Sequence, residues 1–217
     1  MSRPNSARPK STARPPGRGA LVVGITGASG APYAVRLVEC AVRAGRQVHL
    51  VVTRAGRLVL ADETPLGGSP DAPDFSGLWP KDVLAKVAYW PAEDLYAPPA
   101  SGSMRAEATV IIPCSMNTLA ALAHGLSGNL VQRAGQVALK EGRPLVVVPR
   151  EMPVTPIDLE NMSRLAAAGA VVMPAMPGFY HRPRSVADLV DFVVAKALDR
   201  LGIEHELNVR WPGCDQV

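Results

Sequence analysis

The stretch ALVVGITGASGAPYAVRLVECAVRAG, residues 20–45, joins an apolar strand to an amphipathic helix through a glycine-rich turn. Its first six residues are apolar and rich in β-branched side chains, as expected of a buried parallel strand. Pro32 opens the helical pattern and Gly45 follows it, which is the usual placement of proline and glycine at helix termini. The stretch therefore predicts the first β–α step of an α/β fold.

The alternation of buried strands and amphipathic helices continues along the chain and predicts one domain with a doubly wound parallel sheet. Ligands of such folds bind beyond the carboxyl ends of the strands. The segment 62–80 is rich in proline and glycine and is predicted to be a long loop, while residues 81–105 show no clear pattern. Further strands are expected at 47–53, 109–113, 144–149 and 170–173, and helices at 54–61, 115–124, 129–141, 155–169 and from 185 onward.

The net charge of +4 comes from the amino-terminal tail. Residues 1–19 hold five basic and no acidic residues, together with four prolines, and the remainder holds 18 basic against 19 acidic residues. We expect a disordered basic tail over 1–19 and a folded domain over 20–213. A domain so close to neutral gives no compositional support for nucleic-acid binding.

Composition also argues against a membrane or disulfide-rich protein. No apolar run approaches the ~20 residues that a membrane helix needs. The three cysteines, Cys40, Cys114 and Cys214, are too few and too scattered for a disulfide framework or a zinc site. We therefore expect a protein of a reducing, cytoplasmic setting.

Two strand-to-helix turns carry polar groups that suit an anionic ligand. The first, residues 27–30 (GASG), brings backbone amides and one hydroxyl to a helix N-terminus, where a phosphate or an anionic flavin edge is stabilised. The second, residues 113–118 (PCSMNT), has the same character. An ordinary tight turn and an ordinary N-cap at Ser115 are the alternatives. Cys114 ends an apolar strand and is interpreted as a packed core residue, since that is the commoner use of such a cysteine.

A second polar group lies in the carboxyl-terminal half. Arg150 and Glu151 follow a buried strand directly, and the loop 179–183 (FYHRP) precedes the last helix. Arginine and tyrosine are typical anion ligands, although a solvated surface loop would have a similar composition. Glu63 stands alone after the second helix, and by itself a surface position is the simpler interpretation.

The order of these motifs resembles the flavin prenyltransferase family (UbiX-like). The resemblance rests on GITGASGAPYAVRL, PCSMNTLAALAHG, QVALKEGRPLVVVPREMP and PGFYHRP, and extends from about residue 20 to Trp211. It implies a flavodoxin-like Rossmann fold, reduced FMN as co-substrate, no metal, and a homo-oligomer, which is a dodecamer in the family. It also implies transfer of the dimethylallyl group of dimethylallyl phosphate to N5 and C6 of the flavin, and a UbiD-type decarboxylase as recipient of the prenylated FMN.

The resemblance also assigns roles to residues of this sequence. It implies catalytic roles for Ser29, Glu63, Lys140 and Glu151 and binding of dimethylallyl phosphate by Lys140, Arg150, Tyr180 and Lys196. Lys196 stands where arginine is common, which keeps the charge but loses the bidentate fork; Asn117 stands where some members have lysine. The residues implied to hold FMN are Gly27, Ala28, Ser29, Thr53, Ser115, Met116, Asn117, Thr118 and Arg150.

Three other functions are considered. FMN-dependent cysteine decarboxylases share features of residues 117–125, but they use a histidine in the helix after the first glycine turn, and residues 30–34 (GAPYA) have none. A direct aromatic-acid decarboxylase would need an acid–base carboxylate assembly that the sequence does not suggest. A non-catalytic flavin-binding protein would have no use for a second anion pocket.

Overall fold

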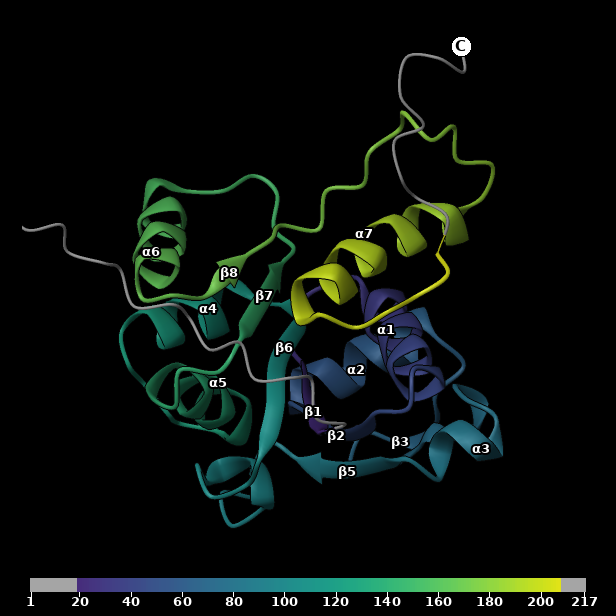
Figure 1. The fold of residues 1–217 in the computed structure, drawn as a ribbon, viewed down its shortest axis with the longest axis horizontal. Coiled ribbons are helices and arrows are strands. Elements are labelled where there is room, and N and C mark those ends of the chain that lie inside the picture. The colour runs from purple at the N-terminus through teal and green to yellow at the C-terminus, as the bar shows by residue number, and fades with distance from the viewer. Residues whose placement is uncertain (1–18, 208–217) are drawn as a thin grey trace, which may run out of the picture.

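The computed structural model describes residues 19–207, which form a parallel six-stranded sheet between two layers of helices (Figure 1). The strand order is β5-β2-β1-β6-β7-β8, and every neighbouring pair is parallel. A separate antiparallel hairpin contains β3 and β4. The strands are β1 (Ala20–Ile25), β2 (Gln47–Val52), β3 (Gly67–Ser69), β4 (Ala72–Asp74), β5 (Val87–Pro91), β6 (Ala106–Cys114), β7 (Leu145–Pro149) and β8 (Val171–Val172).

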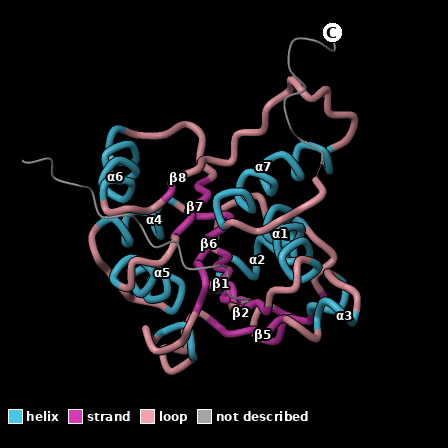
Figure 2. The backbone as a smooth tube through the Cα atoms, viewed as in Figure 1, coloured by secondary structure: helices cyan, strands magenta, loops and turns pink. Residues whose placement is uncertain are grey.

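One helical layer packs on each face of the sheet (Figure 2). The first layer contains α1 (Ala31–Arg43), α2 (Arg54–Glu63), α3 (Lys81–Leu84) and α7 (Val186–Leu201). The second contains α4 (Met116–Ala123), α5 (Leu130–Lys140) and α6 (Pro156–Ala167). Short 3-10 helices lie at Phe75–Gly77 and Pro98–Ala100.

The predicted doubly wound sheet is confirmed, and its strand order is that of a flavodoxin-like Rossmann fold. The five strands β2-β1-β6-β7-β8 follow the flavodoxin order, and β5 extends the sheet beyond β2 to give the six-stranded Rossmann order. Strands β1, β2 and β5 follow one another towards one side of the sheet, and the chain then returns to place β6, β7 and β8 on the other side of β1. The topological switch point therefore lies between β1 and β6. This switch point is where ligands of such folds bind.

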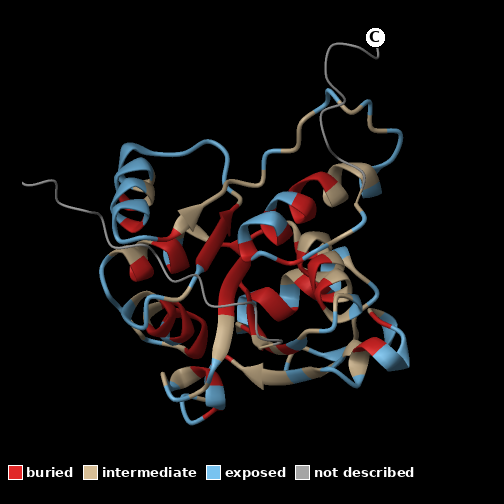
Figure 3. Cartoon of the chain, in the orientation of Figure 1, coloured by how far each residue is buried: buried red, intermediate tan, exposed pale blue. Residues whose placement is uncertain are grey.

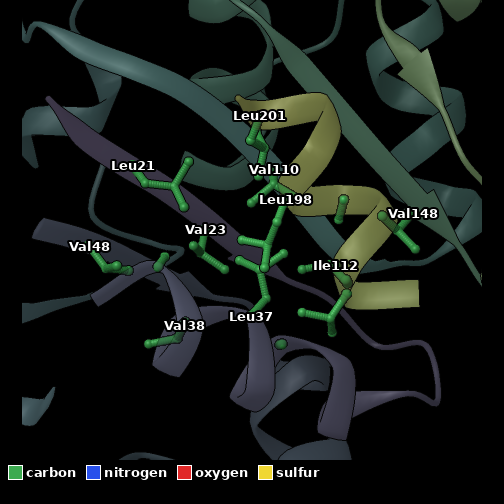
Figure 4. Close-up of a cluster of buried hydrophobic side chains, with 14 of the residues drawn as sticks. Leu21, Val23, Leu37, Val38, Val48, Val110, Ile112, Val148, Leu198 and Leu201 are labelled. Atoms are coloured by element: carbon green, nitrogen blue, oxygen red, sulfur yellow. The ribbon is translucent and has the colours of Figure 1, made fainter. Parts of the chain in front are cut away.

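Side-chain alternation along the strands divides the core between the two faces. Leu21 and Val23 of β1 face α1 and α7, as Figure 4 shows, whereas Val22 faces the opposite layer. Both clusters are almost wholly aliphatic, and the buried residues follow the sheet and the inner sides of the helices (Figure 3). Burial of this apolar surface is the main favourable term in folding.

The helix boundaries follow from capping residues that the sequence contains. Thr155 and Asp158 form the capping box expected at the start of α6, and Ser185 and Asp188 form another at the start of α7. Each hydroxyl accepts the N–H of the aspartate while each carboxylate accepts the N–H of the capping residue.

The predicted loop at 62–80 is wrong in part. This segment contains the hairpin of β3 and β4, followed by the 3-10 helix at 75–77. Strand β5 lies in the segment that showed no pattern; it is a half-exposed edge strand that ends in proline, so neither a continuous apolar run nor a clean alternation marks it.

The remaining predictions on domain limits concern residues outside the described range. The tail predicted over 1–19 lies there except for Gly19, and so do the last residues of the predicted domain, 208–213. Within residues 19–207, no helix is long and apolar enough to cross a membrane.

Candidate functional site

Polar groups predicted for ligand binding gather at the carboxyl edge of the sheet. The turns after β1, β2, β6 and β7 all open at this edge because the strands are parallel. They carry, in that order, residues 27–30, Thr53, residues 115–118 and Arg150 with Glu151. The fold therefore brings together most of the residues predicted to contact FMN.

Glu63, at the end of α2, reaches the first of these turns. Its Oε2 accepts hydrogen bonds from the N–H groups of Gly30 and Ala31, both at 2.8 Å. The Ser29 hydroxyl donates a further hydrogen bond to the same carboxylate. Glu63 is exposed in the single chain, as the simpler interpretation of the sequence predicts. Its carboxylate nevertheless binds the N-terminus of α1.

These contacts keep the Glu63 carboxylate ionised. Partial burial alone would raise the pKa of Glu63, but the hydrogen bonds from Ser29, Gly30 and Ala31 and the nearby charge of Arg150 outweigh burial and lower it. Glu63 is therefore an anion at neutral pH.

Arg150 links this turn to the end of β6. Its Nε donates to the Ser29 carbonyl oxygen at 3.3 Å, and its backbone N–H donates to the Cys114 carbonyl oxygen at 3.3 Å. The guanidinium thus lies beside the Ser29–Glu63 pair at the switch point. Glu151 is exposed next to it, and its carboxylate accepts the N–H of Met152 at 3.1 Å.

The turn after β6 is an N-cap whose hydroxyls are joined. The Ser115 hydroxyl accepts the N–H of Thr118 at 3.4 Å and donates to the Thr118 hydroxyl at 3.2 Å. Cys114 is fully buried, and burial raises the pKa of its thiol far above the usual range. The interpretation of Cys114 as a packed core residue is confirmed.

Thr53 acts within the protein as the N-cap of α2. Its hydroxyl accepts the N–H of Gly56 at 3.0 Å and donates to the Ile25 carbonyl oxygen at 3.4 Å. It therefore ties the turn after β2 to the end of β1.

Tyr180 and Lys196 lie on the segment that leads into and along α7. Figure 2 shows the loop between β8 and α7 extending away from the sheet. In that loop Tyr180 packs edge-on against Phe192, with ring centroids 5.5 Å apart, and His181 stacks on the same ring at 5.2 Å. Lys196 is exposed one helical turn after Phe192.

Lys140 lies at the opposite edge of the sheet from the Ser29–Glu63 pair. It ends α5 five residues before β7 begins, and Arg143 beside it donates to the carbonyl oxygens of Gly102 and Met104 at 2.8 and 2.7 Å. These two residues precede β6, so this is the amino edge of the sheet. The Lys140 side chain is 58% exposed there, with its Nζ 3.7 Å from Glu141.

Comparison with known proteins identifies this arrangement. The Flavoprotein family matches residues 9–198. The flavin prenyltransferase UbiX of Pseudomonas aeruginosa is 48% identical over 194 residues, which cover 88% of this chain and 93% of that protein. The chain belongs to the flavin prenyltransferase family.

Solved structures of two similar proteins have the same fold as this chain. AnUbiX (PadA1), solved in complex with FMN and dimethylallyl pyrophosphate, has a TM-score of 0.79 and 35% identity, covering 90% of this chain and 98% of that one. The dodecameric FMN-dependent UbiX-like decarboxylase of Escherichia coli O157:H7 has a TM-score of 0.78 and 41% identity, covering 89% of this chain and 99% of that one.

The donor set of this flavin prenyltransferase family member fits FMN. Backbone amides of the turn after β1 and the Arg150 guanidinium meet at one edge, and such donors suit a phosphate and the polar edge of a flavin. Among residues 19–207, no cluster of three His, Cys, Asp or Glu side chains is arranged to hold a metal ion.

Sequence reasoning did not single out Thr26, the first residue after β1. It is 1% exposed, and its hydroxyl contacts both Pro113 and Ser115. The available signal was a polar residue ending an otherwise apolar strand, where a buried hydroxyl needs hydrogen-bond partners.

Proposed function

We propose that this chain transfers the dimethylallyl group of dimethylallyl phosphate to N5 and C6 of reduced FMN, giving prenylated FMN. The observation that carries the proposal is the position of the Glu63 carboxylate, which accepts the N–H groups of Gly30 and Ala31 at the switch point of the sheet, with Arg150 bound to the adjoining Ser29 carbonyl oxygen. A proton acceptor and a fixed cation side by side suit a reaction that releases a phosphate and removes a proton from a carbon atom.

In this proposal, Arg150 binds the phosphate of the prenyl donor. Breaking the allylic C–O bond leaves negative charge on the departing phosphate, and a cation already in place stabilises that charge without reorganisation. The contacts of Arg150 with Ser29 and Cys114 fix its backbone and its Nε, and within residues 19–207 no hydrogen bond engages the two terminal nitrogens of its fork, which can bind a ligand. Tyr180 and Lys196 are proposed to add a hydroxyl and a second cation.

In this proposal, Ser29 and Glu63 accept the proton that leaves the flavin. Closing the ring joins C6 of the flavin to one carbon of the prenyl double bond, so the other carbon of that bond gains a proton and the hydrogen on C6 leaves as a proton. The Ser29 hydroxyl donates to Glu63, so a proton taken up by the serine passes to a carboxylate that is already ionised. Glu151, exposed beside Arg150, is proposed to assist at the donor end.

Lys140 takes part only if a second copy of the chain supplies it. Its amine lies at the amino edge of its own sheet, away from Arg150. We therefore propose a homo-oligomer, with a dodecamer as the size to test, because the similar Escherichia coli protein is dodecameric. Exposed apolar side chains near the carboxyl edge, including Met152 at 86% and Phe179 at 70%, would be covered in such an assembly.

The product and the setting complete the proposal. The recipient of prenylated FMN is proposed to be a UbiD-type decarboxylase, since the relatives of this chain are named flavin prenyltransferases. A cytoplasmic location is proposed from the composition, in particular the few scattered cysteines.

The test is mass spectrometry of the flavin. Purified protein is incubated without oxygen with reduced FMN and dimethylallyl phosphate, and the released flavin is expected to gain one C5H8 unit. Dimethylallyl diphosphate in a parallel reaction decides between the two donors. FMN that binds but keeps its mass with either donor would refute the proposal.

The direct decarboxylase is distinguished in the same experiment. The name of the Escherichia coli relative keeps this alternative open. Incubation of the FMN-loaded protein with an aromatic acrylic acid, without any prenyl donor, is expected to release no CO2. Release of CO2 under these conditions would favour the decarboxylase.

A further inference from the structure

Thr26 joins the two turns that flank the switch point of the sheet. The backbone ladder between β1 and β6 ends at the pair Gly24 and Ile111. Beyond it, the Thr26 hydroxyl donates to the Pro113 carbonyl oxygen at 2.9 Å and accepts the N–H of Ser115 at 2.7 Å. The backbone N–H of Thr26 donates to the same carbonyl oxygen at 3.2 Å.

Only a hydroxyl at this position makes both side-chain contacts, because it donates one hydrogen bond and accepts another. Valine has nearly the same shape and fills the same space, but it makes neither. The backbone contact of Thr26 with Pro113 does not depend on the side chain, so β1 and β6 stay joined in a valine variant. What changes is the turn beginning at Ser115.

That turn begins α4 and presents the residues predicted to line the flavin. Ser115 caps α4, and its backbone N–H points toward Thr26. Gly27 follows Thr26 directly, so one buried side chain sets the position of residues 27–30 relative to residues 115–118. Both turns must contact the same FMN molecule, and a small displacement of one against the other weakens binding at both.

We propose that Thr26 is a positioning residue of the FMN site, whose hydroxyl holds the turn after β6 in place against the turn after β1. This inference rests on the proposed function, since it takes FMN as the ligand of both turns. Thr26 acts through Ser115 and is not itself a ligand, because its side chain is 1% exposed and both hydrogen-bonding capacities are used.

The experiment compares three variants by FMN titration, thermal unfolding and visible circular dichroism of the bound flavin. Thr26→Val removes the hydroxyl, and Thr26→Ser keeps it. Thr109→Val is the matched control, because Thr109 is a buried threonine of the neighbouring β6 whose strand partner, Leu145, begins β7 at the amino edge.

Thr26→Val is expected to raise the Kd for FMN about tenfold, since one or two hydrogen bonds are lost at the turn. Its flavin circular dichroism at saturating FMN is expected to change, whereas a purely structural role would lower the unfolding temperature and leave that spectrum unaltered. Thr26→Ser and Thr109→Val are expected to keep both the Kd, within about threefold, and the spectrum.

An unchanged Kd and spectrum in folded Thr26→Val would overturn the inference. If Thr26→Val is not obtained folded, the Thr26→Ser variant decides. Because this variant keeps the hydroxyl, the inference requires it to bind FMN like the wild type. Weakened FMN binding in folded Thr26→Ser would overturn the inference as well. Failure of the proposed function can be told apart from failure of this inference. If the proposed function is wrong, the FMN affinities and spectra of the variants are still as expected here, but the flavin keeps its mass after incubation with the donor.

Discussion

Glu63 places one carboxylate oxygen 2.8 Å from two backbone amides and accepts a hydrogen bond from Ser29. Glu63→Gln keeps the size of the side chain but removes the charge and the ability to take up a proton. We expect FMN affinity within about threefold of wild type and prenylation slowed about 100-fold, the usual contribution of a general base. Single-turnover kinetics followed by mass spectrometry measure the rate. A wild-type rate in this variant would exclude Glu63 from proton transfer.

The same carboxylate makes a pH-dependent contribution to stability. The pKa of Glu63 is lowered in the folded chain, so its contribution is fully present above the ordinary carboxyl pKa of about 4.3 and is lost as the pH falls through the lower folded pKa. The wild type is therefore expected to exceed Glu63→Gln in unfolding free energy at pH 7, and the difference is expected to shrink towards pH 3. Urea unfolding of both proteins across this range measures it. A difference independent of pH would contradict the assigned contacts.

Tyr180 and Lys196 are predicted to act on the prenyl donor and not on FMN. Tyr180→Phe keeps the ring that packs on Phe192 and removes only the hydroxyl, so we expect prenylation to fall about ten- to a hundredfold, the value of a hydrogen bond to a charged group. Lys196→Ala is expected to raise the KM for dimethylallyl phosphate, whereas Lys196→Arg is expected to be tolerated because it restores the fork. FMN affinity should change less than about threefold in all three. Release of FMN with normal turnover of the flavin that stays bound would contradict this assignment.

At the scale of elements, α7 connects the stability of the fold with the loop that carries Tyr180. Ser185→Ala removes the hydroxyl of the capping box and is expected to lower the unfolding free energy by about 1 kcal/mol. Phe192 lies two turns into the same helix and supports Tyr180, so loosening the first turn is also expected to raise the donor KM. Urea unfolding and steady-state kinetics test the two effects. Ser185→Thr, which keeps a capping hydroxyl, is the control and is expected to change neither.

The elements predicted well are those whose pattern is local. The strands at 20–25 and 47–52 and the capped helices starting at 156 and 186 are marked by continuous apolar runs or by capping residues a few positions apart. Strand β5 and the hairpin of β3 and β4 were missed because short, half-exposed edge segments carry neither signal. Pairing with β2, a contact distant in sequence, decides that β5 is a strand.

The residues of the site differ in the same way: some could be predicted from local sequence pattern, and others depend on contacts between residues distant in sequence. Residues 27–30 and 115–118 were predictable because each turn sits between a buried strand and a helix. The contact of Glu63 with Gly30, more than thirty residues away, and the bridge from Thr26 to Ser115 depend on the tertiary fold. Local pattern left Glu63 on the surface, and only the resemblance to a known family gave it, like Ser29, a catalytic role.

At the scale of the whole molecule, one chain holds two halves of the proposed site at opposite edges of its sheet. Glu63 and Arg150 lie at the carboxyl edge and Lys140 at the amino edge. If the lysine of one copy completes the site of another, the contact is head-to-tail, the kind of interface that closes into rings. Activity then depends on assembly, and dilution to monomers is expected to abolish prenylation while FMN binding weakens less.

Co-expression of Lys140→Ala and Glu63→Gln chains tests this arrangement directly. Each variant alone is expected to be nearly inactive. In mixed oligomers, a Glu63→Gln chain supplies an intact Lys140 to a neighbour whose own Glu63 is intact, so about a quarter of wild-type activity is expected to return for random mixing. Complexes carrying two different affinity tags isolate the mixed species, and the separately purified variants combined without exchange are the control. If both residues served a site within one chain, no subunit would contain an intact site and activity would not return.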